Sequence, residues 1–545
     1  MSDASRPVVY DVVIVGAGPS GAVAAKRLAE AGMSVICLEQ GDYPDYSQLR
    51  HAGYEFELTK TRHFTANPRR RDVPSDYPID VSDSDVEPLM WNGVGGSSIL
   101  YAAAWHRLKP SDFRVRTVDG IADDWPLSYA DLAPYYARVE NDFAVSGVGG
   151  DTAYPDGFDI PLPPFPMGDM ERRFAKAHDR LGWHYWPGSN SIATVKHNGL
   201  LPCARRAACT WGCFDGAKAS VDRTHWPVCI KLGVVLVANA RVLRVETGSD
   251  GLATGVTYVD RKTGVTHFQP GRTVIVSANG IGTPRLLLAS ASNAHPDGLG
   301  NSSGMVGKRL MMHPYGTVSG LFDEFFENWR GPYGQRAYSL EFAETRKDTN
   351  FYRGAKWQLM GMGGPLATVG SWPWGDTSGI WGENFHATVQ KRFGHSAYWG
   401  IMAEDLPSDD NMVTLDPVLK DADGMPAAKV RYRASQNTWD LLHYNQERAA
   451  ESMREAGAYE VHVMPLMRET GWHILGSVRM GHDPADSVVD SYGRSHDVPN
   501  LFVMDGSVMP TSGAVNPTGT VAALALRNAE SIIASKRSQP VSQSV

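Results

Sequence analysis

The sequence is poor in the features that mark several large classes of protein. It holds 5 cysteines in 545 residues, too few and odd in number for a disulfide scaffold. Lysine and arginine (52) are outnumbered by aspartate and glutamate (60), and the net charge of −8 has the wrong sign for a nucleic-acid-binding surface. No uncharged apolar run approaches about 18 residues, so we expect no transmembrane helix. Residues 1–6 are polar, so we expect no secretory leader. These absences predict a cytoplasmic protein of enzyme size.

The first forty residues have the pattern of a dinucleotide-binding unit. The β-branched run Val8–Val15 is typical of a buried parallel strand. A G-x-G-x-x-G turn follows at once, and its candidate cofactor residues are Gly16, Gly18, Ser20 and Gly21. In such a turn the first glycine permits the bend, the second lets the backbone approach a pyrophosphate, and the third lets helix pack on strand. A second strand ends in Glu39, an acid placed for the ribose hydroxyls. The unit disfavours NADP and leaves NAD and FAD open.

A second strand and turn near the carboxyl end favours FAD. Residues 498–504 read as a strand that runs into Asp505-Gly506. The loop 514–520 then leads into an alanine-rich helix. A strand, turn and helix in this arrangement can hold the ribityl chain and pyrophosphate of a flavin from the side opposite the glycine turn.

Taken in order, these and other motifs resemble the glucose–methanol–choline (GMC) oxidoreductase family over nearly the whole chain. The matching segments are 16–39, 92–98, 277–288, 304–314, 473–481 and 505–506. The tail from residue 473 is most similar to bacterial gluconate-dehydrogenase-like and pyranose- or glycoside-oxidising members. The resemblance implies an α/β protein in which a Rossmann-like FAD-binding domain is interleaved with a substrate-binding domain built on an antiparallel sheet with helices. We divide the chain accordingly, with residues 1–110, 215–312 and 473–545 in the FAD-binding domain and 111–214 and 313–472 in the substrate-binding domain.

The resemblance also implies cofactor contacts outside the glycine turn. They are Gly95, Gly96 and Ser97 within the first domain segment, Val242 at the adenine, and Asp505, Gly506, Asn516, Pro517 and Thr518 near the carboxyl end. Some sugar-oxidising members carry a histidine that bonds covalently to the flavin. Leu100 stands at that place, so we expect non-covalent FAD. Asn279 replaces a usual glycine, which the tolerance of asparagine for left-handed backbone explains.

Two residues are the candidates for chemistry. The resemblance places His473 at the flavin, where a neutral imidazole is a suitable base for an alcohol hydroxyl near pH 7. It places Asn516 beside the same substrate oxygen, where an amide N–H can stabilise developing negative charge. A structural role, as a buried histidine or a turn-forming asparagine, is the alternative for each. For His313, in Met312-His313-Pro314, we expect a structural role only.

Two other clusters invite a functional interpretation. Cys203, Cys209 and Cys213 match no paired C-x2-C zinc pattern, so we expect a reduced loop and no metal site. The six tryptophans between residues 325 and 399 could stack on a sugar, but tryptophan more often fills a core. We expect most of them in the core, with one or two at the pocket.

The sequence therefore predicts an FAD-dependent alcohol oxidoreductase that oxidises a CH–OH group of a sugar or glycoside. The electron acceptor would be oxygen, a quinone or another acceptor, and the oligomeric state is left open. A flavin-containing lyase of the hydroxynitrile type, with the same fold and a non-redox FAD, is the alternative.

Overall fold

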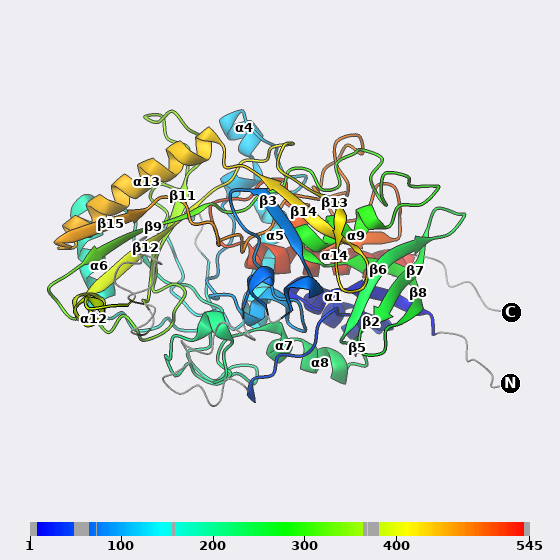
Figure 1. The fold of residues 1–545 in the computed structure, drawn as a ribbon, viewed down its shortest axis with the longest axis horizontal. Helices are drawn as coiled ribbons and strands as arrows, with labels where there is room; N and C mark the ends of the chain where they lie inside the picture. The colour runs from blue at the N-terminus through cyan, green and yellow to red at the C-terminus, as the bar shows by residue number, and fades with distance from the viewer. Residues whose placement is uncertain are drawn as a thin grey trace.

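The computed structural model describes residues 8–47, 65–71, 73–154, 158–362, 364, 368 and 381–538. It is an α/β structure with three sheets in this part of the chain (Figure 1). The seven-stranded sheet lies at the right of Figure 1, the six-stranded sheet at the left, and the three-stranded sheet in the upper middle.

The seven-stranded sheet grows from the buried amino-terminal strand. Its strands are β1 (Tyr10–Val15), β2 (Val35–Leu38), β5 (Val235–Val237), β6 (Ala240–Thr247), β7 (Ala253–Asp260), β8 (Val265–Val276) and β16 (Leu501–Val503). The order is β5-β2-β1-β8-β7-β6, with β16 also paired to β8. The first half of β8 pairs antiparallel with β7, and the second half pairs parallel with β1 and β16. The carboxyl ends of the parallel strands therefore meet at one edge, where α/β sheets bind ligands.

The six-stranded sheet is antiparallel. Its strands are β4 (Trp186–Pro187), β9 (Tyr315–Leu321), β10 (Ala337–Ser339), β11 (Ala355–Met360), β12 (Ser396–Ala403) and β15 (Glu460–Met464), in the order β15-β9-β12-β11-β10-β4. Helix α13 (Gln436–Glu455) covers one face, where Trp357, Trp399 and Leu441 share a core. Because side chains alternate along a strand, residues 356, 358 and 360 of β11 lie on the opposite face.

The three-stranded sheet joins distant parts of the chain. It pairs β3 (Ile79–Ser84) with β14 (Pro426–Tyr432), which in turn pairs with β13 (Met412–Lys420). The remaining helices are α1 (Pro19–Glu30), α4 (Val115–Asp119), α5 (Tyr129–Asp142), α6 (Asp169–Leu181), α7 (Val221–Thr224), α8 (Trp226–Lys231), α9 (Asn279–Ala289), α12 (Phe385–Arg392) and α14 (Thr518–Ser538).

The expected α/β fold class is confirmed. Every strand of the seven-stranded sheet falls in the segments assigned to the FAD-binding domain, and every strand of the six-stranded sheet falls in the other segments. The boundaries between the two domains stay a prediction. Within the described ranges, no helix is long and apolar enough to cross a membrane. The cytoplasmic location also stays a prediction.

Candidate active site

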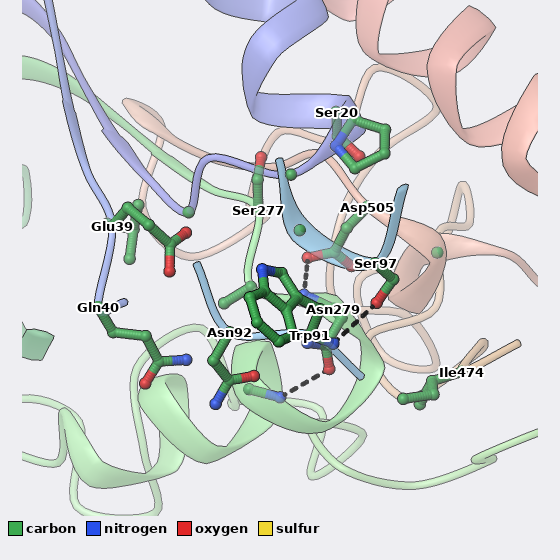
Figure 2. Close-up of a pocket in the computed structure, with 18 of the residues that line it drawn as sticks. Ser20, Glu39, Gln40, Trp91, Asn92, Ser97, Ser277, Asn279, Ile474 and Asp505 are labelled. Carbon is green, nitrogen blue, oxygen red and sulfur yellow. Dashed lines mark hydrogen bonds between the residues drawn. The ribbon is translucent and has the colours of Figure 1, made fainter. Parts of the chain in front are cut away.

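One pocket follows the carboxyl ends of β1 and β2 and reaches the loop that holds His473 (Figure 2). Eleven of the predicted cofactor residues line it: Gly16, Gly18, Ser20, Glu39, Gly96, Ser97, Val242, Asp505, Gly506, Pro517 and Thr518. Gly21, Gly95 and Asn516 lie outside this lining. Gly21 instead packs helix against strand, because a Cβ there would lie 2.1 Å from the Gly16 carbonyl oxygen.

The glycine turn leaves room and hydrogen-bond donors for a phosphate. Gly16 has φ +104°, and a Cβ on it would lie 2.5 Å from the Ser277 carbonyl oxygen. Gly96 has φ +53°, and its Cβ would lie 2.6 Å from the Gly18 Cα. Gly18 is the N-cap of α1 and has no side chain to accept from the first helical N–H groups. The helix therefore begins with open donors that suit a pyrophosphate.

Glu39 directly follows β2 and is a fixed, buried acid. Its side chain accepts hydrogen bonds from the backbone N–H of Ala17 (2.9 Å) and of Gly41 (3.0 Å). Burial raises the pKa of this carboxyl, and the backbone donors partly oppose that effect. The uncapped helix, the close-packed glycines and this carboxylate fit the pyrophosphate and ribose of FAD.

The side chains around Val242, where we expect the adenine, were not predicted from the sequence. Val242 lies in β6, and the neighbouring Arg241 extends toward Tyr77, with its guanidinium carbon 5.8 Å from the ring centre. Arg285 approaches the same ring at 4.9 Å, and both arginines pair with the buried Asp421. These partners come from four separate segments, so no local pattern marks them.

Asp505 connects the turn after β16 with the turn between β8 and α9. Its carboxylate accepts from the Asn279 backbone N–H at 3.1 Å, from the Thr283 hydroxyl at 2.6 Å and from the Ser507 backbone N–H at 2.8 Å. The first of these contacts is drawn in Figure 2. Asn279 has φ 68°, the left-handed backbone expected of it, and its side-chain oxygen accepts from the Ile281 N–H at 2.9 Å.

Leu100 cannot form a covalent flavin bond. It is 7% exposed and packs in a small cluster with Ile99, Trp91 and Phe214. Its isobutyl side chain holds no nucleophile, in agreement with the expected non-covalent cofactor.

A short antiparallel pairing brings His473 to His313. The Met311 and Leu475 backbones exchange two hydrogen bonds, of 2.9 and 3.0 Å. His313 lies two residues after Met311, and His473 lies two residues before Leu475. Because the pairing is antiparallel, the two histidines stand opposite each other. Their Nδ1 atoms are 2.8 Å apart, and the rings meet edge to face. The structure thus gives His313 a contact with the candidate base, which its expected structural role did not include.

The hydrogen bonds around these rings determine which nitrogen carries each proton. His313 Nε2 lies 2.6 Å from the Gly513 carbonyl oxygen, which can only accept, so this nitrogen carries the proton. Burial lowers the pKa of His313 to about 4, so the ring is neutral and its Nδ1 is an acceptor. His473 Nδ1 must then be the donor between the two rings. The remaining nitrogen of His473, Nε2, is unprotonated, so its lone pair can accept a hydrogen bond or a proton.

Asn516 faces that lone pair. Its Nδ2 lies 3.5 Å from His473 Nε2, at the residue pair before α14 begins. Loss of hydration lowers the pKa of His473 well below its usual value, and His313 and Lys356 add to the effect. The imidazole is therefore held neutral. The two catalytic candidates predicted from the sequence therefore lie side by side. The unprotonated Nε2 of His473 faces the N–H donor of Asn516.

Two of the six tryptophans of the 325–399 region lie in the core, and none of those that the structure describes lines the pocket. Trp357 and Trp399 are buried in the core under α13, and Trp381 is 81% exposed. Trp372 and Trp374 lie outside the described residues. The tryptophans of the pocket lining are Trp91 and Trp472, neither of which belongs to the 325–399 region.

The cysteine loop packs beside the segment that follows Gly96. Cys203, Cys209 and Cys213 are free thiols in a cluster with Tyr101. The buried Lys218 donates to the Ile99, Tyr101 and Cys209 carbonyl oxygens and so ties this loop to the segment after Gly96. No group of three ligating side chains among the described residues is placed to hold a metal. The expected absence of a metal stays a prediction, which metal analysis of active enzyme tests.

Comparison with known proteins matches this geometry to one family. The GMC oxidoreductase models match residues 10–315 and 407–525. A 2-methyl-1,2-propanediol dehydrogenase of Mycolicibacterium austroafricanum is 40% identical over 525 residues, covering 95% of this chain and 94% of that protein. The fructose dehydrogenase large subunit of Gluconobacter japonicus is 28% identical, covering 96% and 97%.

A solved structure shares the fold. Pyridoxine 4-oxidase from Mesorbium loti superposes with a TM-score of 0.65 at 19% identity, covering 96% of this chain and 99% of that chain. The two family matches agree with the cofactor pocket and with the uncapped helix that begins at it. The chain belongs to the GMC oxidoreductase family and is an FAD-dependent oxidoreductase acting on CH–OH groups.

Proposed function

We propose that the protein oxidises an alcohol carbon that carries a neighbouring hydroxyl, in a sugar, a glycoside or a short 1,2-diol. The observation that carries the proposal is the bare Nε2 of His473 beside the Asn516 amide. The sequence predicts a sugar or glycoside. The relative at 40% identity, named for a 1,2-diol, extends the class to smaller substrates that share the adjacent hydroxyl pair.

The proposed base is His473 Nε2. Because the His313 contact keeps the proton of His473 on Nδ1, Nε2 is ready to take the hydroxyl proton of the substrate. FAD, when bound, supplies the acceptor for the hydride that leaves the same carbon. The proton and the hydride leave together as an alcohol becomes a carbonyl.

Asn516 has the complementary task. As the hydroxyl proton leaves, negative charge grows on the substrate oxygen. The Nδ2–H of Asn516, 3.5 Å from the nitrogen that takes the proton, is placed to donate to that oxygen. In the same pocket, the half-exposed Trp472 packs edge to face on Tyr315, with ring centres 5.5 Å apart, and forms an apolar wall next to His473.

The proposal is tested by flavin reduction without oxygen. His473→Ala removes the proton acceptor but none of the groups at the pyrophosphate or ribose. General base catalysis contributes roughly 10²–10⁴-fold, so the variant should bind FAD and reduce it that much more slowly. The defect should shrink as pH rises, because hydroxide partly replaces the base. His482→Ala, at an exposed histidine, is the matched control. Wild-type reduction by FAD-loaded His473→Ala would overturn the proposal.

The substrate class is tested by an anaerobic screen. Sugars, glycosides and 1,2-diols are mixed with the wild-type enzyme, and loss of the oxidised flavin absorbance is followed. Mono-alcohols of equal size serve as controls, since they lack the adjacent hydroxyl. Reoxidation of the reduced enzyme by air or by a quinone dye then separates an oxidase from a dehydrogenase.

A further inference from the structure

A buried lysine reaches the site from the six-stranded sheet. Lys356 lies in β11 beside Trp357, whose indole N–H donates to Asn445 of α13 at 2.8 Å. Because neighbouring residues of a strand face opposite ways, Lys356 extends from the face away from α13. Its side chain is 0% exposed, and its Nζ donates to the Asn516 side-chain oxygen at 2.5 Å.

Among the described residues, Lys356 differs from the buried arginines in having no acidic partner. The buried Lys218 also lacks an acid but donates to three backbone carbonyl oxygens, whereas Lys356 donates to one side-chain oxygen. Arg353, also 0% exposed, pairs with Asp112 and Glu404, and Arg107 pairs with Glu140. No described carboxylate lies within 4.0 Å of Lys356 Nζ, although almost every fully buried lysine in proteins is paired. Burial lowers the pKa of the Lys356 amine well below its ordinary value, and burying this group without an acidic partner costs stability. The fold therefore carries Lys356 at a cost, which points to a role in the site.

Imidazoles surround the same position. His106, His313 and His473 all have a lowered pKa, caused first by burial and further by the positive charge of Lys356. His106 Nε2 is occupied by the Gln335 side-chain oxygen at 2.9 Å, and the two nitrogens of His313 are used as described above. Among the described residues, Lys356 Nζ donates its hydrogen bond to Asn516 Oδ1.

This contact decides how the Asn516 amide is turned. An amide has an oxygen that accepts and a nitrogen that donates, and a rotation of the side-chain amide exchanges the two. With Oδ1 held by Lys356, Nδ2 is directed at His473 Nε2. If the amide rotated, Oδ1 would face the substrate oxygen and repel its growing negative charge.

We propose that Lys356 is a positioning residue, which holds the Asn516 amide with its nitrogen toward the substrate oxygen and strengthens that nitrogen as a donor. The strengthening follows because a hydrogen bond to the carbonyl end of an amide polarises its N–H end. The inference rests on the proposed function, since it requires Asn516 to donate to the substrate.

The test replaces Lys356 by a side chain of similar size that cannot donate. Lys356→Met should fold, bind FAD and melt at or above the wild-type temperature, because an unpaired buried charge is removed. Anaerobic flavin reduction at saturating substrate should fall about 10- to 100-fold, with little change in the apparent substrate affinity. Lys356→Gln, which keeps an N–H donor on a shorter side chain, should recover part of the rate. Gln358→Met, on the same face of β11, controls for disturbance of the strand.

A double-mutant cycle separates positioning from a general structural role. In an Asn516→Ala background, adding Lys356→Met should slow flavin reduction less than 2-fold further, since the amide it positions is gone. Three results would each overturn the inference. The first is that the losses of flavin-reduction rate in the two single variants add in the double variant. The others are a lower melting temperature of Lys356→Met with a matching loss of rate in Gln358→Met, and flavin reduction at the wild-type rate by Lys356→Met. If Lys356→Met does not bind FAD, Lys356→Leu, which also lacks a donor, takes its place in the cycle. Fast reduction by Asn516→Ala alone would refute the proposed function itself.

Discussion

Substituting His313, the hydrogen-bond partner of His473, should impair the candidate base although His473 itself is unchanged. His313→Leu deletes the acceptor of the His473 Nδ1–H, now 2.8 Å away, and leaves that N–H unsatisfied. An unsatisfied buried donor costs about 1–3 kcal/mol. The ring can relieve this cost by moving its proton to Nε2, the nitrogen that must accept the substrate proton. If the cost enters the barrier, flavin reduction slows roughly 5- to 150-fold.

The assay is stopped-flow reduction of the flavin under anaerobic conditions, with FAD content measured on the same samples. His313→Asn, whose side-chain oxygen can accept near the position of Nδ1, should lose less than His313→Leu. His482→Gln, at an exposed histidine, should behave as wild type. If FAD-loaded His313→Leu reduces its flavin at the wild-type rate, the assignment of the proton to Nδ1 of His473 is wrong.

Further predictions concern the cofactor and pH. Acid denaturation should release FAD into the supernatant, because Leu100 has no group to bond it; flavin retained in the pellet would contradict this. Glu39→Ala should raise the Kd for FAD, measured by fluorescence titration of apoenzyme, while the loaded fraction keeps its reduction rate. Gly96→Ala should abolish FAD loading, because its Cβ would lie 2.6 Å from the Gly18 Cα. Because the pKa of His473 is lowered, its base form persists as pH falls, so kcat/KM should decline only well below about pH 6.5. An acidic limb at or above that pH would argue against His473 as the base.

The nucleotide end could be predicted because its signals are local. The strand, glycine turn and helix of residues 10–30 are adjacent in the chain, and each constrains its own backbone. Gly16 needs a positive φ and Glu39 directly follows the next strand, so both positions can be recognised in the sequence. The motif around His473 was likewise visible through its resemblance to a family.

The other half of the site could not be predicted in this way. His313 meets His473 only because segments 160 residues apart pair at Met311 and Leu475. Lys356 reaches Asn516 from a strand of another sheet, also 160 residues away in sequence. A lysine in a strand usually lies at the solvent, and only the tertiary structure shows that this one is fully buried.

The pairing of Met311 with Leu475 also limits how this enzyme can change. Each partner precedes or follows its histidine by two residues, and side chains alternate in direction along extended chain. A single-residue insertion or deletion between Met311 and His313, or between His473 and Leu475, would turn one imidazole away from the other. Substitutions at the intervening residues keep the spacing. Variation in these two stretches should therefore replace side chains and keep the number of residues constant. Libraries that vary loop length to alter specificity should be made in other segments of the chain.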